Sequence, residues 1–265
     1  MKRSLAFILA CLLVLTGCGA PAAESTPPEE SAPQPEPWTG LRIVHGAEDG
    51  GLVLAGEGAG EVYTLSVGDV PVYLDGAPAD SSELKNGMEV EVVCEGIMES
   101  YPGQFYRPSA IYAESLDTER GDLCGLYLKV LNDLWEKDSG LNSNIEYVGV
   151  DLTNAPGDLT DGEKHAIAWV FGGTHQVVAL TMSRDELIER GYLTPVGEPK
   201  EGEHALYEWK NGVLFTISAA EGEKGMKFDA AKWRSPLGAY IFSECEAEAD
   251  SEGNWSYSIG SEAIS

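Results

Sequence analysis

The N-terminal segment constrains this chain more than any other part of its sequence. Two basic residues at positions 2 and 3 precede an apolar stretch of 11 residues, Leu5 to Leu15, which runs into Thr16-Gly17-Cys18. The stretch is too short to span a bilayer comfortably, and a basic start followed by a short apolar core is the layout of an export signal. We therefore predict a signal peptide over residues 1–17, so that only the chain after it folds.

The end of this segment resembles the lipobox of bacterial lipoproteins, with Leu15, Thr16 and Gly17 ahead of Cys18. Small residues at these positions let a signal peptidase reach the backbone, and the Cys18 thiol then takes a diacylglycerol. The resemblance implies an exported protein, held on the outer face of the bacterial cell membrane by the lipid on Cys18. Two alternatives are an ordinary signal peptide in which Cys18 is incidental and a single transmembrane anchor.

Residues 18–37 are predicted to be a disordered tether that starts at the lipidated Cys18. Residues 19–37 contain six Pro and four Glu and no large apolar side chain. Such a segment buries too little surface to offset the entropy of ordering it. In an extended polyproline conformation it would reach on the order of 60 Å.

Charge excludes one large class of partners. The chain has 17 Lys and Arg against 44 Asp and Glu, and loss of Lys2 and Arg3 leaves 15 against 44, a net charge of −29. A nucleic-acid backbone would be repelled, and so would a broad contact with anionic lipid. The expected partners are the membrane, through the lipid, and an envelope protein or small ligand that the sequence does not identify.

Residues 38–115 are predicted to form a small OB-like β domain. Short β-type runs separated by turn residues fill this region: LRIVHGA, GLVLAG, EVYTLSV, VPVYLDG, MEVEVVCEG and FYRPSAIYAES. Five or six such strands, with a short helical turn between Ser81 and Asn86, favour a small barrel or sandwich.

Residues 116–265 are predicted to form an α+β domain, because helical and strand patterns alternate. Leu123, Tyr127, Val130 and Leu134 are spaced by four, three and four, which predicts an amphipathic helix over 120–137. Thr160 and Ser183 begin capping boxes for two further helices, through Trp169 and up to Gly191. Strands are expected at 145–152 and 176–181, a short helix near 229–234, and a final hairpin of 238–249 with 255–263.

Two further expectations concern strand register. Around Lys210-Asn211-Gly212, a three-residue hairpin loop would pair Trp209 with Val213 and place the flanking apolar side chains on one face. Along residues 240–250, strict alternation would place Glu244, Glu246, Glu248 and Asp250 on one face with Tyr240 and Phe242.

The region 84–105, LKNGMEVEVVCEGIMESYPGQF, resembles a segment of uncharacterised bacterial lipoproteins, and DLCGLYLKVLNDLW, IEYVGVDL and KWRSPLGAYIFS resemble their second domain. In that family an OB-like module follows a lipobox and a polar tether. The matching residues in the first segment are Leu84, Gly87, Val90, Val92, Gly96, Ile97, Tyr101 and Pro102. These are packing and turn residues, so the resemblance implies a fold and no activity.

Catalytic and metal-binding signals are weak. The four His, at 45, 165, 175 and 204, are not at metal-ligand spacing, and surface or capping roles are favoured over a zinc site shared by His165 and His175. An acidic loop around residues 151–163 lacks the regular spacing of a calcium loop. Cys94, Cys124 and Cys245 are expected to be buried thiols, with a bridge between Cys124 and Cys245 as the alternative. We expect no catalytic residue, no metal and no cofactor.

Two groups of residues are candidates for a binding surface. Tyr101, Phe105 and Tyr106 follow the long strand of the first domain, and Trp233 and Arg234 belong to the most basic stretch of the second. The leading hypothesis is an anchored binding module without catalysis. The alternatives are an envelope glycan or peptide hydrolase that uses paired carboxylates, and a structural subunit of an envelope complex. A short linker between the domains predicts one rigid body, joined through Leu123 and Tyr127, with any ligand site near the junction.

Overall fold

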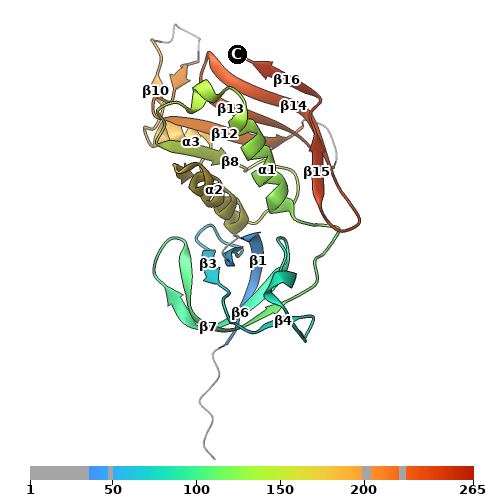
Figure 1. Cartoon of the computed structure of the whole chain (residues 1–265). Helices are drawn as coiled ribbons and strands as arrows, with labels where there is room; N and C mark the ends of the chain where they lie inside the picture. The colour runs from blue at the N-terminus through green and yellow to red at the C-terminus, as the bar shows by residue number, and fades with distance from the viewer. Residues whose placement is uncertain (1–35, 47–49, 199–203, 221–224) are drawn as a thin grey trace, which may run out of the picture. The chain divides into compact units, whose positions relative to one another are not determined.

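The computed structural model describes residues 36–46, 50–198, 204–220 and 225–265. The predicted signal, Cys18 and nearly all of the predicted tether lie outside the described residues. Residues Pro35–Ser265 belong to one compact unit with two seven-stranded sheets, so the fold is mixed α+β (Figure 1). No helix in the described part of the chain is both long and apolar enough to cross a membrane.

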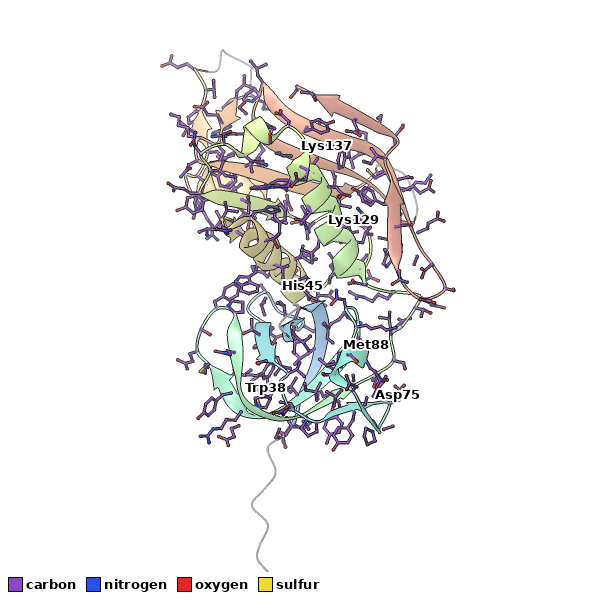
Figure 2. The ribbon with its side chains drawn as sticks, viewed as in Figure 1. Trp38, His45, Asp75, Met88, Lys129 and Lys137 are labelled. Atoms are coloured by element: carbon purple, nitrogen blue, oxygen red, sulfur yellow. The ribbon has the colours of Figure 1, made fainter. Side chains whose placement is uncertain are left out.

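The first sheet closes into a five-stranded barrel. Its strands are β1 (Trp38–Gly46), β2 (Gly51–Ala55), β3 (Val62–Ser66), β6 (Glu89–Met98) and β7 (Gly103–Ala113). Their order is β3-β2-β1-β6-β7, and a parallel pairing of β3 with β7 completes the circle. Alternate residues of β6, Val90, Val92 and Cys94, face the interior, where Met88 also packs (Figure 2). Buried and exposed side chains thus alternate along β6, as in a strand with one face toward the core.

A small hairpin and a short turn follow β3. Strands β4 (Val72–Leu74) and β5 (Ala77–Ala79) extend the sheet beyond β7, with β4 parallel to β7. A 3-10 turn, η1 (Ser81–Glu83), comes next, where the capping box of Asp80 and Glu83 fixes its start. The helical turn expected between Ser81 and Asn86 is thus confirmed.

The second sheet has the order β15-β14-β13-β12-β8-β9, with β16 also beside β14. The strands are β8 (Tyr147–Asp151), β9 (Val178–Leu180), β12 (Gly212–Ala219), β13 (Lys227–Ser235), β14 (Gly238–Ala249), β15 (Trp255–Ser258) and β16 (Ser261–Ile264). Strands β12, β8 and β9 run parallel, and both β15 and β16 pair with β14, so the predicted final hairpin is confirmed.

Helices cover both faces of this sheet. Helices α1 (Leu123–Glu136) and α2 (Asp161–His175) pack on the face that carries Val148, Val213 and Phe215. On the opposite face α3 (Arg184–Glu189) brings Leu187 against Leu214. The connecting segment between α1 and β8 holds the short turn η2 (Ser139–Asn142).

The predicted helices are present with adjusted ends. α1 is shorter than 120–137, because Asp122 accepts from the Gly125 N–H and starts it. α2 begins at the predicted capping box of Thr160 and Glu163 but continues past Trp169 to His175, where Gln176 in the left-handed region closes it. α3 begins at the predicted box of Ser183 and Glu186.

The helix expected near 229–234 is wrong, because this segment is the middle of β13. Its burial alternates, with Phe228, Ala230 and Lys232 facing the core. Ala-Ala-Lys favours a helix locally, but strand partners on both sides override that preference.

The predicted hairpin around Asn211 is also wrong. Tyr207 and Glu208 form β11, which pairs with β10 (Thr194–Pro195), while β12 lies between β8 and β13. Val213 lies opposite Val148 of β8, and the Trp209 N–H donates to the carbonyl of Arg234 at 2.7 Å. The distant strand β8 occupies the edge that a hairpin partner would have used.

The acidic face expected along β14 is corrected by a bulge. Glu244 has φ +54°, and the register with β13 shifts between Phe242 and Cys245. The extra residue reverses the alternation, so Phe242, Cys245 and Ala247 face the core while Glu246 points outward. The glutamates therefore do not share a face with Phe242.

Lys232 is a buried cation that the sequence pattern did not reveal. Its side chain is fully buried, and Nζ donates to the carbonyls of Trp135, Lys137 and Asp138 at 3.0, 2.6 and 3.3 Å. The carbonyls of Trp135 and Lys137 belong to the last turn and C-cap of α1, where no helical N–H is left to donate to them, and that of Asp138 begins η2. Burial lowers the pKa of Lys232 to about 8. Lys232, one residue of the basic stretch noted in the sequence, therefore serves as a hydrogen-bond donor to the C-terminal end of α1.

The barrel packs directly on the helices of the second region. Val44, Val53, Ala55 and Val62 of the barrel belong to the same buried cluster as α1 and α2. Leu123 and Tyr127 lie in that cluster, as expected, but α2 makes the specific hydrogen bonds. Thr160 Oγ1 donates to the Gly56 carbonyl at 2.7 Å, and the Gly162 N–H donates to the Glu57 carbonyl at 3.3 Å.

Candidate functional site

The start of α2 closes one side of this junction with buried charge. Glu163 is 1% exposed and contacts Arg42 Nε at 3.2 Å and Arg120 Nη2 at 2.8 Å. Its Oε2 also accepts from the Thr160 N–H at 2.8 Å, as the capping box requires. Arg42 pairs in addition with Glu89. The Glu163 carboxylate thus joins β1, the segment before α1 that holds Arg120, and α2. The sequence predicted its role in the capping box but not its two ion pairs.

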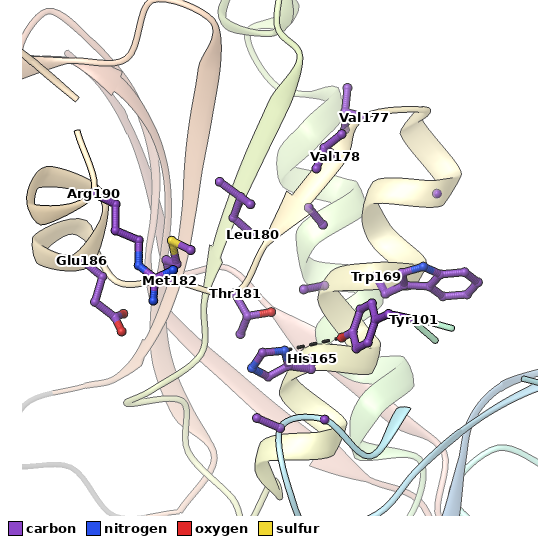
Figure 3. Close-up of a pocket in the computed structure, with 15 residues that line it drawn as sticks. Tyr101, His165, Trp169, Val177, Val178, Leu180, Thr181, Met182, Glu186 and Arg190 are labelled. Carbon is purple, nitrogen blue, oxygen red and sulfur yellow. Dashed lines mark hydrogen bonds between the residues drawn. The ribbon is translucent and has the colours of Figure 1, made fainter. Parts of the chain in front are cut away.

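On another side of α2 the junction opens into a cleft of about 810 Å³. It is formed by the rim of the barrel, the exposed side of α2, the strand β9 and the helix α3 (Figure 3). Its lining residues are Ala59, Gly60, Tyr101, His165, Ala168, Trp169, Gly173, Val177, Val178, Ala179, Leu180, Thr181, Met182, Glu186 and Arg190. We call this the junction cleft.

Tyr101, His165 and Trp169 form one wall of the junction cleft. His165 and Trp169 are one helical turn apart, so both project from the same side of α2. The Tyr101 hydroxyl lies 3.5 Å from His165 Nδ1, the outer limit of a hydrogen bond, and Tyr101 is 57% exposed (Figure 3). Burial lowers the pKa of His165 and raises that of Tyr101, so both side chains are neutral at pH 7.

Glu186 and Arg190 lie on the α3 side of the cleft. Glu186 Oε2 accepts from the Ser183 N–H at 2.8 Å and from its hydroxyl at 2.9 Å, and these bonds lower the pKa of Glu186. Arg190 is exposed, and among the described residues no carboxylate lies within 4.0 Å of its guanidinium. The Glu186 carboxylate caps α3 and also interacts electrostatically with Arg190, four residues further along the chain.

The sequence candidates are placed as follows. Tyr101 lines the cleft, but Phe105 is 5% exposed and packs against Trp38 and Tyr63 in the barrel. Tyr106 is exposed beneath Arg107, outside the cleft. The five candidates therefore do not form one surface.

Trp233 and Arg234 lie on β13, and both contact other residues of the chain. Arg184 lies over the Trp233 ring, with 4.8 Å to its centroid. The Arg234 guanidinium donates to the carbonyls of Leu141, Ser143 and Lys210 at 3.0, 2.8 and 2.6 Å. Neither residue lines the junction cleft.

The histidines, cysteines and acidic loop form no joint site in the described part of the chain. His165 contacts Tyr101, whereas His175 Nε2 lies 2.8 Å from Asn132 Oδ1 and its ring stacks on Trp135. Within the described residues, no three His, Cys, Asp or Glu side chains are grouped to hold a metal. Cys94, Cys124 and Cys245 are buried and free, so the alternative bridge between Cys124 and Cys245 is absent.

His165, Trp169 and the β9 segment are the cleft residues that sequence reasoning did not select. The spacing of His165 and Trp169 on one helix face was available as a signal. Their proximity to Tyr101, 64 residues away from His165, depends on how the barrel docks on α2.

The junction cleft offers aromatic surfaces for stacking, neutral hydrogen-bonding groups and the exposed guanidinium of Arg190 beside Glu186. These are groups that orient and hold a ligand. Comparison with known proteins adds no assignment: no family model, no curated protein and no solved structure matches the chain.

Proposed function

We propose that this chain is a lipid-anchored bacterial envelope protein that binds its ligand or partner in the junction cleft. The observation that carries the proposal is the cleft itself, where the exposed Tyr101 ring, the half-buried Trp169 ring and a neutral imidazole line about 810 Å³ between two regions of the molecule. Clefts of this size at such junctions, lined by apolar groups with a few polar ones, are common binding places.

The barrel supports this proposal as an OB-like module. Its first three strands form a meander, and β7 lies between β6 and β3, parallel to β3. Tyr101 lies between β6 and β7, the fourth and fifth strands of the barrel. The corresponding loop of OB folds contributes to the binding of oligonucleotides and oligosaccharides. The strongly acidic surface argues against the first of these ligands here.

The arrangement gives less support to the two alternatives. A paired-carboxylate hydrolase needs two carboxyl groups about 5 to 10 Å apart at the bond it cleaves. Among the described residues that line the junction cleft, only Glu186 carries a carboxylate, and it caps α3. A structural subunit would present a flat apolar patch, whereas Tyr101, His165 and Trp169 surround a hollow.

Anchoring is tested by replacing Cys18 with Ala in the full chain. We expect the wild-type protein to partition into detergent after processing, and the variant to be either unprocessed or released. A Cys18→Ala protein that is processed and still partitions into detergent would overturn the lipoprotein assignment.

Ligand binding is tested on the mature chain in detergent micelles. Panels of envelope glycans and peptides are screened by thermal shift, and each hit is repeated with Trp169→Ala. The control is Trp38→Ala, which removes an exposed indole outside the cleft (Figure 2). We expect hits to be lost with Trp169→Ala and retained with Trp38→Ala. Hits that survive both changes would place the binding site elsewhere.

A further inference from the structure

A second cavity adjoins the junction cleft at Trp169. It encloses about 430 Å³ between strands β2, β3 and β7 of the barrel and the second half of α2. We call it the barrel pocket, and its lining residues include Val53, Thr64, Ser66, Gln104 and Thr174. Trp169 and Gly173 line both the barrel pocket and the junction cleft. The half-buried Trp169 indole therefore lies where the two cavities meet.

The same two walls run along both cavities. On α2, His165 lines the junction cleft and Thr174 lines the barrel pocket, with Trp169 between them in the helix. On the barrel, Tyr101 lines the cleft, and Gln104, three residues later on β7, lines the pocket. Each cavity has the size that takes a small ligand of its own. A ligand that fills both is therefore built of several units.

The barrel pocket presents neutral hydrogen-bonding groups. Thr64 and Gln104 lie opposite each other on β3 and β7, so their side chains share the outer face of the barrel. Gln104 is exposed, and the Thr64 hydroxyl donates to the Gly103 carbonyl at 3.4 Å. The hydroxyl of the exposed Thr174 donates to the Val170 carbonyl at 2.9 Å. Both hydroxyls can still accept a hydrogen bond, and the amide can donate and accept.

Charge is nearly absent from both cavities, although the protein has 44 Asp and Glu. No Asp, Glu, Lys or Arg is among the described residues that line the barrel pocket. In the junction cleft the two charged side chains, Glu186 and Arg190, interact with each other. A charged ligand would lose its hydration here without gaining a counter-charge. The cavities therefore suit an uncharged ligand that carries hydroxyl or amide groups.

A peptide finds no strand partner in the junction cleft. The edge of β9 away from β8 is covered by α2, because the Val177 N–H donates to the Gly172 carbonyl at 3.0 Å. A Cβ at Gly172 would also lie 3.1 Å from the Ala179 nitrogen, so no other chain fits between them. Recognition in the two cavities thus depends on aromatic rings, hydroxyls and an amide.

Building on the proposed function, we infer that the ligand is an uncharged linear oligosaccharide that runs from the junction cleft past Trp169 into the barrel pocket. A pyranose ring has an apolar face of C–H groups, which packs on the electron-rich face of an aromatic ring such as Trp169 or Tyr101. Its rim of hydroxyls exchanges hydrogen bonds with neutral side chains of the kind that Thr64 and Gln104 supply. Several such units in a row match the two adjoining cavities.

Chain length is the first test. Chito-oligosaccharides and cello-oligosaccharides of two, four and six units are titrated into the mature chain in micelles by isothermal calorimetry. In the series that binds, affinity is expected to rise by about ten-fold or more from two units to six, because only the longer sugars reach both cavities. Equal affinities for two and six units would overturn a site that spans both cavities.

The second test varies the charge of the sugar. A fully deacetylated, cationic chito-hexamer and an anionic hexagalacturonate are compared with the uncharged hexamers in about 0.3 M salt, which screens the acidic surface. Each charged sugar is expected to bind about ten-fold more weakly, or weaker still. A charged hexamer that binds as tightly as the best uncharged one would show that the ligand is not neutral.

Gln104→Ala tests the barrel pocket on the protein itself. We expect it to weaken the six-unit sugar by about five-fold, because hydrogen bonds to the amide are lost. The control is Ser109→Ala, which changes an exposed residue of the same strand that lines neither cavity and should leave affinity unchanged. Thermal unfolding establishes that both variants are folded. If folded Gln104→Ala binds the six-unit sugar as wild type does, the barrel pocket is not part of the site.

Peptides in the same assay separate this inference from the proposed function. If a peptide binds in a manner that Trp169→Ala abolishes and no sugar binds with Kd below about 1 mM, the oligosaccharide is overturned and the cleft remains a binding site. If neither class binds below that limit, both the oligosaccharide inference and the binding function of the cleft are contradicted.

Discussion

Helix α2 meets its surroundings at the junction on two sides that differ in charge, exposure and hydrogen bonding. On the closed side Glu163 is buried between Arg42 and Arg120, and its carboxylate also caps the helix. On the open side His165, Trp169 and the exposed Tyr101 form one wall of a cleft. The charged residues of the closed side pair with each other, whereas side chains of the open side remain accessible to a ligand.

The difference separates stability from binding. A buried carboxylate with two cations holds the barrel in a fixed position on α2, since any displacement would leave charge unpaired. That fixed position in turn holds Tyr101 near His165 and keeps the cleft open. We expect changes on the closed side to affect unfolding, and changes on the open side to affect ligand affinity.

The largest effect is expected when the barrel is separated from the helices. Residues 36–115 expressed alone would expose Val44, Val53, Ala55 and Val62, at a cost of about 5 kcal/mol. This is comparable with the whole stability of a small domain, so the fragment should be largely unfolded. The measurement is urea unfolding of the fragment beside calorimetry of the mature chain, which should show one transition. Two separated transitions and an equally stable fragment would contradict a joint fold.

Glu163→Gln is the next largest change. It leaves Arg120, whose side chain is 18% exposed, without its counter-charge, and we expect a loss of about 3 kcal/mol in the free energy of unfolding, measured with urea. The control is Glu57→Gln, because Glu57 is exposed and contributes its carbonyl to the junction. That control should stay within about 0.5 kcal/mol of wild type. Matching urea midpoints for the two variants would show that the closed side does not hold the junction.

Lys232→Met tests a buried charge that has carbonyl partners in place of a carboxylate. The carbonyls of Trp135, Lys137 and Asp138 lose the ammonium donor, although Asn142 still donates to the first and Leu141 to the third, so we expect a loss of about 2 kcal/mol at pH 7. The matched control is Lys129→Met, an exposed lysine paired with Asp133 on α1, which should change stability little.

The same lysine predicts a pH dependence. The pKa of Lys232 is about 8 in the folded protein and about 10.5 in the unfolded chain, so the unfolded state binds more protons between these values. Wild-type stability therefore rises with pH through this window relative to Lys232→Met. The measurement is the unfolding free energy of the wild type minus that of Lys232→Met, determined at pH 7.5 and again at pH 9.5. We expect this difference to be larger at pH 9.5. A difference that stays constant or narrows would contradict a lowered pKa.

The smallest effect on stability is expected on the open side. Tyr101→Ala removes an exposed ring, and stability should change by about 0.5 kcal/mol or less. Affinity for the cleft ligand should fall by about ten-fold, because a wall of the site is lost. Tyr106→Ala, on the same barrel but outside the cleft, should leave affinity unchanged. A large loss of stability with Tyr101→Ala would erase the distinction between the two sides.

Local patterns in the sequence determined much of the secondary structure. Capping boxes at Thr160 and Ser183 place the starts of α2 and α3, because side-chain oxygens three residues apart satisfy the first free N–H groups of a helix. In β6 apolar residues at every second position lie on the buried face, because successive side chains of a strand point to opposite sides. These features depend on residues within one or two turns of each other.

Strand partners and the sites themselves were decided only by the tertiary structure. Parallel pairing of β12 with β8 displaced the expected hairpin at Asn211, and the bulge at Glu244 reversed the face of β14. The two arginines around Glu163 and the meeting of Tyr101 with His165 join residues more than 40 positions apart. Such contacts are selected by the packing of whole elements, because no local pattern records which strand edge or helix face will be left for another segment to occupy.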